Sequence, residues 1–324
     1  MTMNPKEPWE VLKACEFGGP GDIAGGVTYQ EVVEPEDGFG KPAIHFAAES
    51  GQLDKIKDGV TAKQLAEARH ADTGKTALHC AAESKSQPHS LRQIAGGVTA
   101  LDLIAARDNL GWTALHSAVY SQTLEHIDGG VTIQQLIEAR DNSGQSAILI
   151  NPFWVDHVKE DLKFDLLAAE RNTRGQTVIH ILAQHGRLNA ISGGVTAQQL
   201  DALRDGEGTT ALQDALIACA ISQINGGLES GLLTVDELNT TLIDIVESEY
   251  VGHHCYETIR ELIRVGANKI IVLEKIRAEA STIETSGEMH DWQKDKLRFL
   301  IKFAQDSEFY VSDVISSKIL AQLI

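Results

Sequence analysis

Hydrophobic residues recur along this 324-residue chain at a fixed distance from one another. In four places a valine is followed five positions later by a leucine. The pairs are Val60 with Leu65, Val98 with Leu103, Val131 with Leu136 and Val195 with Leu200. An apolar residue just before a helix packs against one five positions later as a hydrophobic staple, which fixes the angle at which the chain enters the helix. The spacing therefore predicts a helix that begins just after each valine.

Each pair encloses a polar helix-start motif, as in "GGVTAQQL" at 193–200. Threonine at the N-cap accepts a hydrogen bond from the backbone N–H three residues on, and Gln or Glu there bonds back to the threonine N–H. The preceding glycine suits the left-handed residue that ends the element before. The motif lacks the preceding strand and the lysine of a phosphate-binding loop. The predicted structural caps are Thr28, Thr61, Thr99, Thr132, Thr196 and, further along the chain, Thr234.

The motif repeats with a period near 33 residues. The equivalent valines stand at 27, 60, 98, 131 and 195, which are 33, 38, 33 and 64 residues apart. The last gap is two periods long, and the segment 161–175 fits the missing, degenerate copy because Arg171 and Gly175 match Arg140 and Gly144. Such a period predicts a stack of repeated helical units, a solenoid.

A second phrase lies between these motifs and is clearest as "GKTALHCAAESK" from Gly74 and "GWTALHSAVYSQ" from Gly111. Phrase and period together resemble the ankyrin repeat family, over about 25–225. The resemblance implies that His45, His79, His116 and His180 bind neighbouring backbone groups within the stack. Two departures stand out: the family's proline is retained only at Pro42, and the long second helix is split into a short turn ("LEHI") and a capped helix ("TAKQLAEAR").

We therefore predict an all-α fold: an ankyrin-like α-solenoid of about six repeats with modified outer helices. Residues 1–24 form an N-terminal segment, 25–225 the repeats, and 226–324 a helical C-terminal cap or small helical domain. In the last part, apolar residues recur at the three- and four-residue spacing of amphipathic helices. The clearest set is Leu297, Leu300, Ile301 and Phe303.

The repeat pattern breaks in "GQSAILINPFWVDHV". Leu149 replaces the histidine there, and Pro152 falls inside the expected helix, where it removes a backbone donor and ends or kinks the helix. In the ankyrin family this part of the repeat lies near the concave binding face, and aromatic residues are enriched at interface hot spots. The candidate partner-binding residues are Trp112, Tyr120, Phe153 and Trp154. The alternative is that these rings fill a gap left by the irregular repeat.

The composition of the chain indicates which classes of partner and which cellular compartment to expect. The formal charge of −18 disfavours binding to nucleic acid and to anionic lipid, and favours a basic partner. No stretch reaches the roughly 18 apolar residues of a membrane span. Cys15, Cys80, Cys219 and Cys255 form no CxxC pair and the N-terminus resembles no signal peptide, so we expect reduced cysteines and a cytoplasmic type of protein.

The sequence indicates no catalytic motif, no metal site and no cofactor. "HHC" at 253–255 is the one cluster of reactive residue types, but neighbouring residues on a helix point about 100° apart and cannot converge on one metal. The four repeat histidines are excluded as a shared metal ladder because successive repeats lie about 10 Å apart, whereas Zn–N bonds are about 2 Å long.

Three hypotheses of function follow. The first is a non-catalytic scaffold that binds a protein through its concave face; its organisation resembles ankyrin effectors that intracellular bacteria deliver into host cells. The second is an enzyme whose helical C-terminal third carries Cys255 with His253 or His254, the repeats holding the substrate. The third is an acidic inhibitor that covers a basic protein. The sequence leaves the partner and the oligomeric state open.

Overall fold

The computed structural model describes residues 27–34, 36–85, 89–158, 160–248, 255–286 and 291–306. The predicted N-terminal segment, Cys15, the histidines of "HHC" and the final apolar segment 312–324 lie outside these ranges. The chain divides into two compact units, Met1–Asp161 with Glu170–Thr173 and Leu162–Ala169 with Arg174–Ile324. This division falls inside the repeats; the boundary at 225 stays a prediction.

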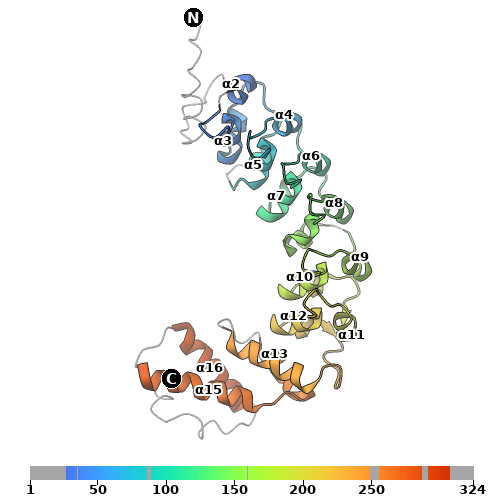
Figure 1. The fold of residues 1–324 in the computed structure, drawn as a ribbon, viewed down its shortest axis with the longest axis vertical. Coiled ribbons are helices and arrows are strands. Elements are labelled where there is room, and N and C mark those ends of the chain that lie inside the picture. Colours follow the sequence, from blue (N-terminus) through green and yellow to red (C-terminus); the bar gives the residue numbers. More distant parts are fainter. Residues whose placement is uncertain are drawn as a thin grey trace, which may run out of the picture. The chain divides into compact units, whose positions relative to one another are not determined.

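In the first unit, short helices stack in two rows (Figure 1). The inner row consists of α3 (Ala43–Ser50), α5 (Ala77–Glu83) and α7 (Ala114–Ser121). The outer row consists of α2 (Tyr29–Val33), α4 (Ala62–Glu67), α6 (Ala100–Ala105) and α8 (Ile133–Glu138). Each inner helix packs on the next inner helix and on an outer one. The fold is the predicted all-α, ankyrin-like solenoid.

The split second helix is confirmed. After the inner helix of each regular repeat lies a one-turn 3₁₀ helix: η1 (Leu53–Lys55), η2 (Ser90–Gln93), η3 (Leu124–His126), η6 (Leu188–Ala190) and η7 (Ile221–Gln223). Glycines with positive φ follow, among them Gly97 at +77°. A Cβ at Gly97 would require the Asp128 carboxylate to turn aside, and the positive φ is strained for any residue with a Cβ, so the backbone conformation is what favours glycine here.

The outer helix starts also join neighbouring repeats through the backbone. The N–H of Asp128 donates to Val98 O at 2.8 Å, and Ala95 N–H donates to Val60 O at the same distance. In the second unit the equivalent residues form a short parallel ladder between β1 (Val195–Thr196) and β2 (Ile224–Asn225). The valines and leucines of all four predicted staples are buried, so each staple is part of the core.

The fourth repeat has lost its regular inner helix, as Pro152 predicts. Its place is taken by two 3₁₀ segments, η4 (Ala147–Leu149) and η5 (Pro152–Asp156). Asn151 compensates for the break: its Oδ1 accepts the Phe153 N–H at 3.0 Å, and its Nδ2 donates to Val119 O of α7 at 2.7 Å. The irregular segment is thereby tied to the repeat before it.

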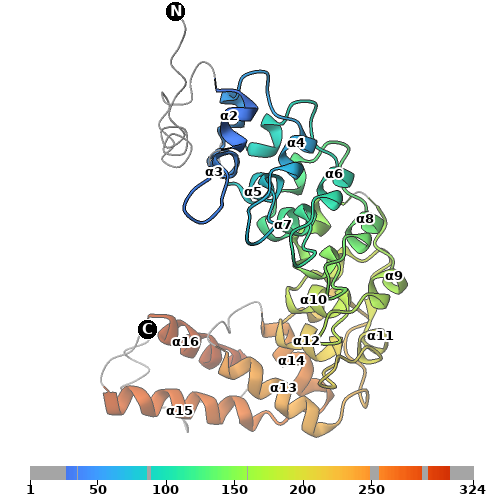
Figure 2. The same ribbon diagram turned by 45° about the horizontal axis from the view of Figure 1, so that its top comes forward.

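The second unit contains repeat helices of its own and then a group of longer helices (Figure 2). Its repeat helices are α9 (Phe164–Ala169), which is the predicted degenerate copy, α10 (Val178–Gln184), α11 (Ala197–Asp201) and α12 (Ala211–Ile217). Four longer helices follow: α13 (Val235–Glu247), α14 (Tyr256–Val265), α15 (Ile270–Ser286) and α16 (Asp291–Asp306). Helix α13 packs on α12 and so covers the last repeat. The amphipathic set from Leu297 to Phe303 is buried, as predicted.

Candidate binding surface

The inner helices begin with a capping box in which histidine takes the place of glutamine. At the start of α7, the Thr113 N–H donates to His116 Nδ1 at 3.2 Å, and the His116 N–H donates to Thr113 Oγ1 at 3.3 Å. Thr76 with His79 and Thr177 with His180 form the same box, and Thr210 with Gln213 forms the glutamine version of it. The three threonine–histidine boxes are buried. The histidine boxes were not predicted, because Gln and Glu are the usual returning side chains of a capping box.

Each of these histidines also reaches the next repeat, which confirms the role that the family resemblance implies. The Nε2 atoms lie within hydrogen-bond distance of a backbone carbonyl: His45 with Lys75 O (3.0 Å), His79 with Trp112 O (2.9 Å), His116 with Gln145 O (3.3 Å) and His180 with Thr209 O (3.4 Å). A carbonyl only accepts, so Nε2 carries the ring proton, and an Nδ1 that accepts a threonine N–H carries none. These rings are neutral, and burial lowers the pKa of His79 and His116.

Pro42 corrects one point of the sequence analysis. It is the N-cap of α3, the position that Thr76 holds in α5, so it replaces the threonine of the phrase and is not the family's retained proline. Proline has neither a backbone N–H nor a hydroxyl. As a result His45 Nδ1 is buried and has no hydrogen-bond partner among the described residues. Burial also lowers the pKa of His45 to about 4.

Two positions on the inner row change character along the first unit: the residue just before each N-cap and the residue in the last helical turn. In the first repeat they hold an ion pair, Lys41 to Glu49 at 2.8 Å, and in the second Lys75 to Glu83 at 2.6 Å. In the third repeat the same two positions hold Trp112 and Tyr120. The self-neutralised pairs thus give way to two aromatic residues.

The two aromatic residues differ in how firmly they are held. The half-buried Trp112 stacks on the His116 ring, with 4.6 Å between centroids, and its Nε1 donates to Ser117 Oγ at 3.1 Å. Ser117 in turn donates to Glu83 Oε1 at 2.8 Å, which links the indole to the ion pair of the repeat before. The Tyr120 side chain is 68% exposed. The third repeat therefore combines Trp112, whose ring is held by its contacts, with Tyr120, whose side chain is largely exposed.

Phe153 and Trp154 take different places in the fourth repeat. Phe153 holds the position of Tyr120 and is half-buried. Trp154 is only 1% exposed, and its Nε1 donates to Ile148 O at 3.0 Å. Its predicted place on the binding surface is wrong, because the indole fills the space left by the missing helical turns. Partner-binding candidates are thus reduced to Trp112, Tyr120 and Phe153.

The predicted outer caps stand at the first turns of helices. Thr61, Thr99, Thr132, Thr196 and Thr234 each accept the N–H of the residue three positions on. Thr28 donates its N–H to Glu31 Oε2 at 2.7 Å. At Thr99 the returning side chain is Asp102, whose Oδ2 accepts the threonine N–H at 2.9 Å. All six threonines shape the turns and are no part of the candidate surface.

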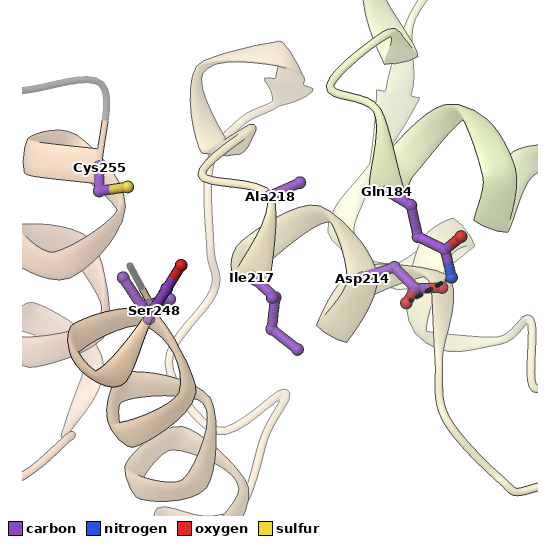
Figure 3. Close-up of a pocket in the computed structure, with 7 residues that line it drawn as sticks. Gln184, Asp214, Ile217, Ala218, Ser248 and Cys255 are labelled. Atoms are coloured by element: carbon purple, nitrogen blue, oxygen red, sulfur yellow. Dashed lines mark hydrogen bonds between the residues drawn. The ribbon is translucent and has the colours of Figure 1, made fainter. Parts of the chain in front are cut away.

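Sequence analysis missed a pocket of about 330 Å³ in the second unit (Figure 3). Gln184 and Ile217, which line it, hold the position of Tyr120 in their repeats. Asp214, also in the lining, is 8% exposed and accepts a hydrogen bond from Gln184 Nε2 at 3.1 Å. At the position of Asp214 the other repeats carry Phe46, Cys80, Ser117, Ile150 and Ile181. The pocket could have been predicted from the sequence by one signal, a charged residue at a position that is apolar or small in the other repeats.

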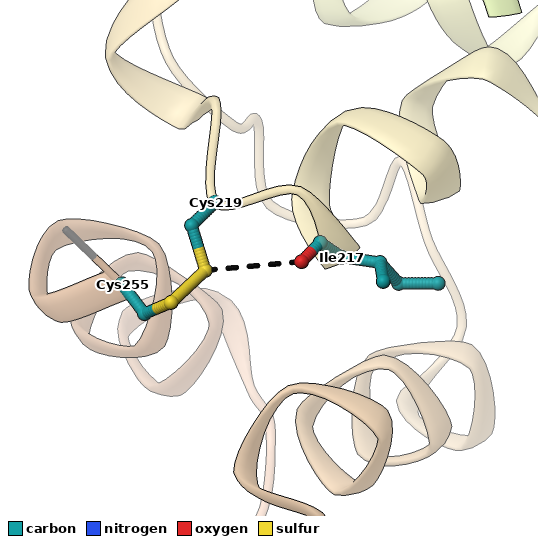
Figure 4. Close-up of a disulfide and its surroundings, with 3 residues drawn as sticks. All are labelled: Ile217, Cys219 and Cys255. Atoms are coloured by element: carbon teal, nitrogen blue, oxygen red, sulfur yellow. Dashed lines mark hydrogen bonds between the residues drawn. A yellow bond between two sulfur atoms is a disulfide. The ribbon is translucent and has the colours of Figure 1, made fainter. Parts of the chain in front are cut away.

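The cysteines differ from expectation. Cys219 and Cys255 form a disulfide, with their Cα atoms 4.8 Å apart, that ties the turn after α12 to the start of α14 (Figure 4). The prediction of reduced cysteines is wrong for this pair, because stacking brings residues 36 positions apart into contact. Cys80 is free but buried, and burial raises the pKa of its thiol. The enzyme hypothesis thus loses its proposed nucleophile, since Cys255 carries no thiol.

Within the described residues, no set of three or more His, Cys, Asp or Glu side chains is arranged to hold a metal ion. None of the helices described there has the length and apolar character that crossing a bilayer needs.

Comparison with known proteins adds little to these contacts. No family model matches the chain, and no curated protein matches it. Among solved structures it is similar to an ankyrin repeat protein from Leishmania major, at 13% identity and a TM-score of 0.34, over 94% of this chain and 99% of that one. The assignment of the repeats therefore rests on the helices, caps and histidine contacts described above.

Proposed function

We propose that this protein is a non-catalytic scaffold that binds another protein through the inner face of its repeats, centred on Tyr120. The observation that carries the proposal is the replacement of the ion pairs of the first two repeats by Trp112 and Tyr120 in the third. In the first two repeats, the Lys and Glu side chains of each ion pair neutralise each other and need no binding partner for this. A large exposed ring beside an anchored indole offers apolar area with little loss of side-chain freedom on binding.

The test compares two exposed apolar side chains of the first unit. Tyr120 lies on the inner helix α7, and Leu101, which is 63% exposed, lies on the outer helix α6. Proteins captured from a cell lysate by the wild type are compared with those captured by Tyr120→Ala and Leu101→Ala at equal melting temperature. We expect Tyr120→Ala to lose at least one captured protein that Leu101→Ala retains. Equal capture by both variants would contradict the proposal.

A further proposal concerns the cell from which the partner comes. A short chain that joins divergent repeats to a helical tail resembles ankyrin effectors of intracellular bacteria, so we propose a host-cell protein as the partner. Capture from host lysate is then expected to exceed capture from bacterial lysate at matched protein concentration. The opposite ranking would assign the protein to a role inside its own cell.

The excess of acidic residues supports a second candidate, an inhibitor of a basic protein. The formal charge of −18 attracts such a partner over long range, and salt screens that attraction beyond about 8–10 Å. A titration of the captured partner at low and at high salt distinguishes the scaffold from the inhibitor. A contact dominated by Tyr120 keeps its affinity, whereas a charge-dominated contact weakens steeply.

A further inference from the structure

The pocket in the second unit contains a charge that the described residues do not balance. Asp214 takes part in no ion pair among those residues, and its Oδ2 atom is buried without a hydrogen bond. Its other oxygen already accepts the Gln184 amide. A buried carboxylate without a counter-charge is unfavourable, and burial accordingly raises the pKa of Asp214 to about 6. At neutral pH the Asp214 carboxyl group is still mostly ionised, so a bound cation would neutralise the buried charge.

The walls of the pocket define the rest of the ligand. Ile217, Ala218 and Ile245 contribute apolar surface. A ligand that matches both features has an apolar stem and a positively charged end. The volume of about 330 Å³ lies at the lower limit of small-molecule sites, about 300–1,000 Å³, and suits a single long side chain.

Lysine fits this chemistry better than arginine. A guanidinium binds a carboxylate best through two parallel hydrogen bonds, one to each oxygen. At Asp214 only Oδ2 is without a hydrogen bond among the described residues, and the Gln184 amide already takes one of the two acceptor directions of Oδ1, which hinders a two-bond contact. A lysine ammonium acts as a compact point charge and needs one oxygen. Since Oδ2 is buried, a lining side chain must turn aside as the amine enters, and Ile217, at 44% exposed, has room to do so.

We infer that this pocket binds a lysine side chain of the polypeptide that the scaffold holds. The inference rests on the proposed protein-binding function and names the chemistry of the partner at one position. The overall negative charge of the chain favours the same kind of partner.

The test uses the full chain and a lysine mimic, n-butylammonium, with 1-butanol as the neutral analogue of equal heavy-atom count. Binding is followed by NMR at constant ionic strength, through the Gln184 side-chain amide and the Ala218 backbone amide. We expect saturable shifts in the millimolar range with n-butylammonium and at least tenfold weaker binding of 1-butanol. N-butylguanidinium is expected to bind more weakly than n-butylammonium.

Two variants and a matched control locate the effect. Asp214→Asn keeps the shape of the side chain and the acceptor for Gln184, and is expected to weaken n-butylammonium binding at least tenfold. Asp236→Asn makes the same change of charge near the start of α13, far along that helix from Ile245, and is expected to leave binding unchanged. Ala218→Leu fills the pocket and is expected to abolish binding, so the inference stays testable if Asp214→Asn folds poorly.

Three results would overturn the inference: no saturable shift in the wild type, equal binding of 1-butanol, or undiminished binding in Asp214→Asn. The experiment needs no partner protein, so its failure is separate from that of the proposed function. If Tyr120→Ala loses a captured protein while n-butylammonium does not bind to the pocket, only the lysine assignment is wrong. If the pocket binds n-butylammonium and Tyr120→Ala loses nothing, only the proposed binding face is wrong.

Discussion

The inner and outer rows of the first unit use the same helix-start motif in two environments. At Thr113 and at Thr99, the threonine Oγ1 accepts an N–H at 3.3 Å and the threonine N–H is bonded in return. Thr113 is fully buried, whereas Thr99 is exposed. The inner box also reaches the next repeat through the His116 side chain, whereas beside the outer box the link to the next repeat is a backbone bond, from the Asp128 N–H to Val98 O. A motif that looks alike in the sequence therefore joins repeats through a buried side chain on the inner row, and lies beside a backbone link on the outer one.

The largest predicted effect of this difference is on stability. Thr113→Ala leaves the buried His116 N–H without its acceptor and is expected to lower the free energy of unfolding by about 2–3 kcal/mol. Thr99→Ala exposes the equivalent N–H to water and is expected to cost about 1 kcal/mol. Urea denaturation of the full chain at neutral pH measures both. Equal losses would show that burial of the inner box contributes nothing.

A smaller effect is expected from His116→Gln. Gln213 shows that glutamine fits this position, since its Oε1 accepts the Thr210 N–H at 2.9 Å. The variant keeps the capping box but gives up the histidine contact with Gln145 O, so we expect a loss of about 1 kcal/mol at pH 7. Thermal unfolding at pH 7, beside wild type, measures it. An unchanged melting temperature would mean that this link between repeats adds no stability.

The same variant tests the pH dependence of the stack. The pKa of the folded His116 lies below the unfolded value of about 6.5. Below that pH the unfolded chain binds more protons, so stability falls on acidification, by up to about 1.4 kcal/mol per pH unit for each such histidine. Asp214 acts oppositely, because its raised pKa favours the folded state as pH falls below about 6. Its contribution cancels in the difference between wild type and His116→Gln, and wild type is expected to lose stability more steeply.

The smallest effect concerns the first repeat, where the inner box is incomplete. Pro42→Thr supplies a hydroxyl and a backbone N–H that His45 Nδ1 lacks. Pro42→Ala supplies the N–H alone. We expect the threonine variant to be more stable than the alanine variant by about 1 kcal/mol, as for other N-caps. Guanidinium titrations of the two variants measure the difference, and a null difference would show that the threonine hydroxyl is dispensable at this position.

Local features of the fold were readable from the sequence. The capping threonines and the staples connect residues three to five positions apart, so their spacing is visible along the chain. The break at Pro152 was readable for the same reason, because proline acts on its own helix. The histidine contacts with the next repeat came from the family resemblance, since no local spacing predicts a bond across about 30 residues.

The candidate site was less predictable because it depends on contacts between repeats. Tyr120 and Trp154 are both aromatic residues near the end of an inner segment, yet one is exposed and the other is bonded to Ile148 O in the core. Asp214 and its pocket require helices from several segments to meet. The disulfide between Cys219 and Cys255 has the same origin. These features belong to the packing of repeats and not to any one of them.

We infer that the buried threonine–histidine boxes make the inner row a rigid platform for the exposed residues at its helix ends. Hydrogen exchange of the free protein measures this rigidity at two amides, the Thr113 N–H, which donates to His116, and the Thr99 N–H, which donates to Asp102. After correction for intrinsic rates, the Thr113 amide is predicted to exchange at least about tenfold more slowly, because it opens only when repeats separate. Equal exchange at the two amides, or faster exchange at Thr113, would contradict the account.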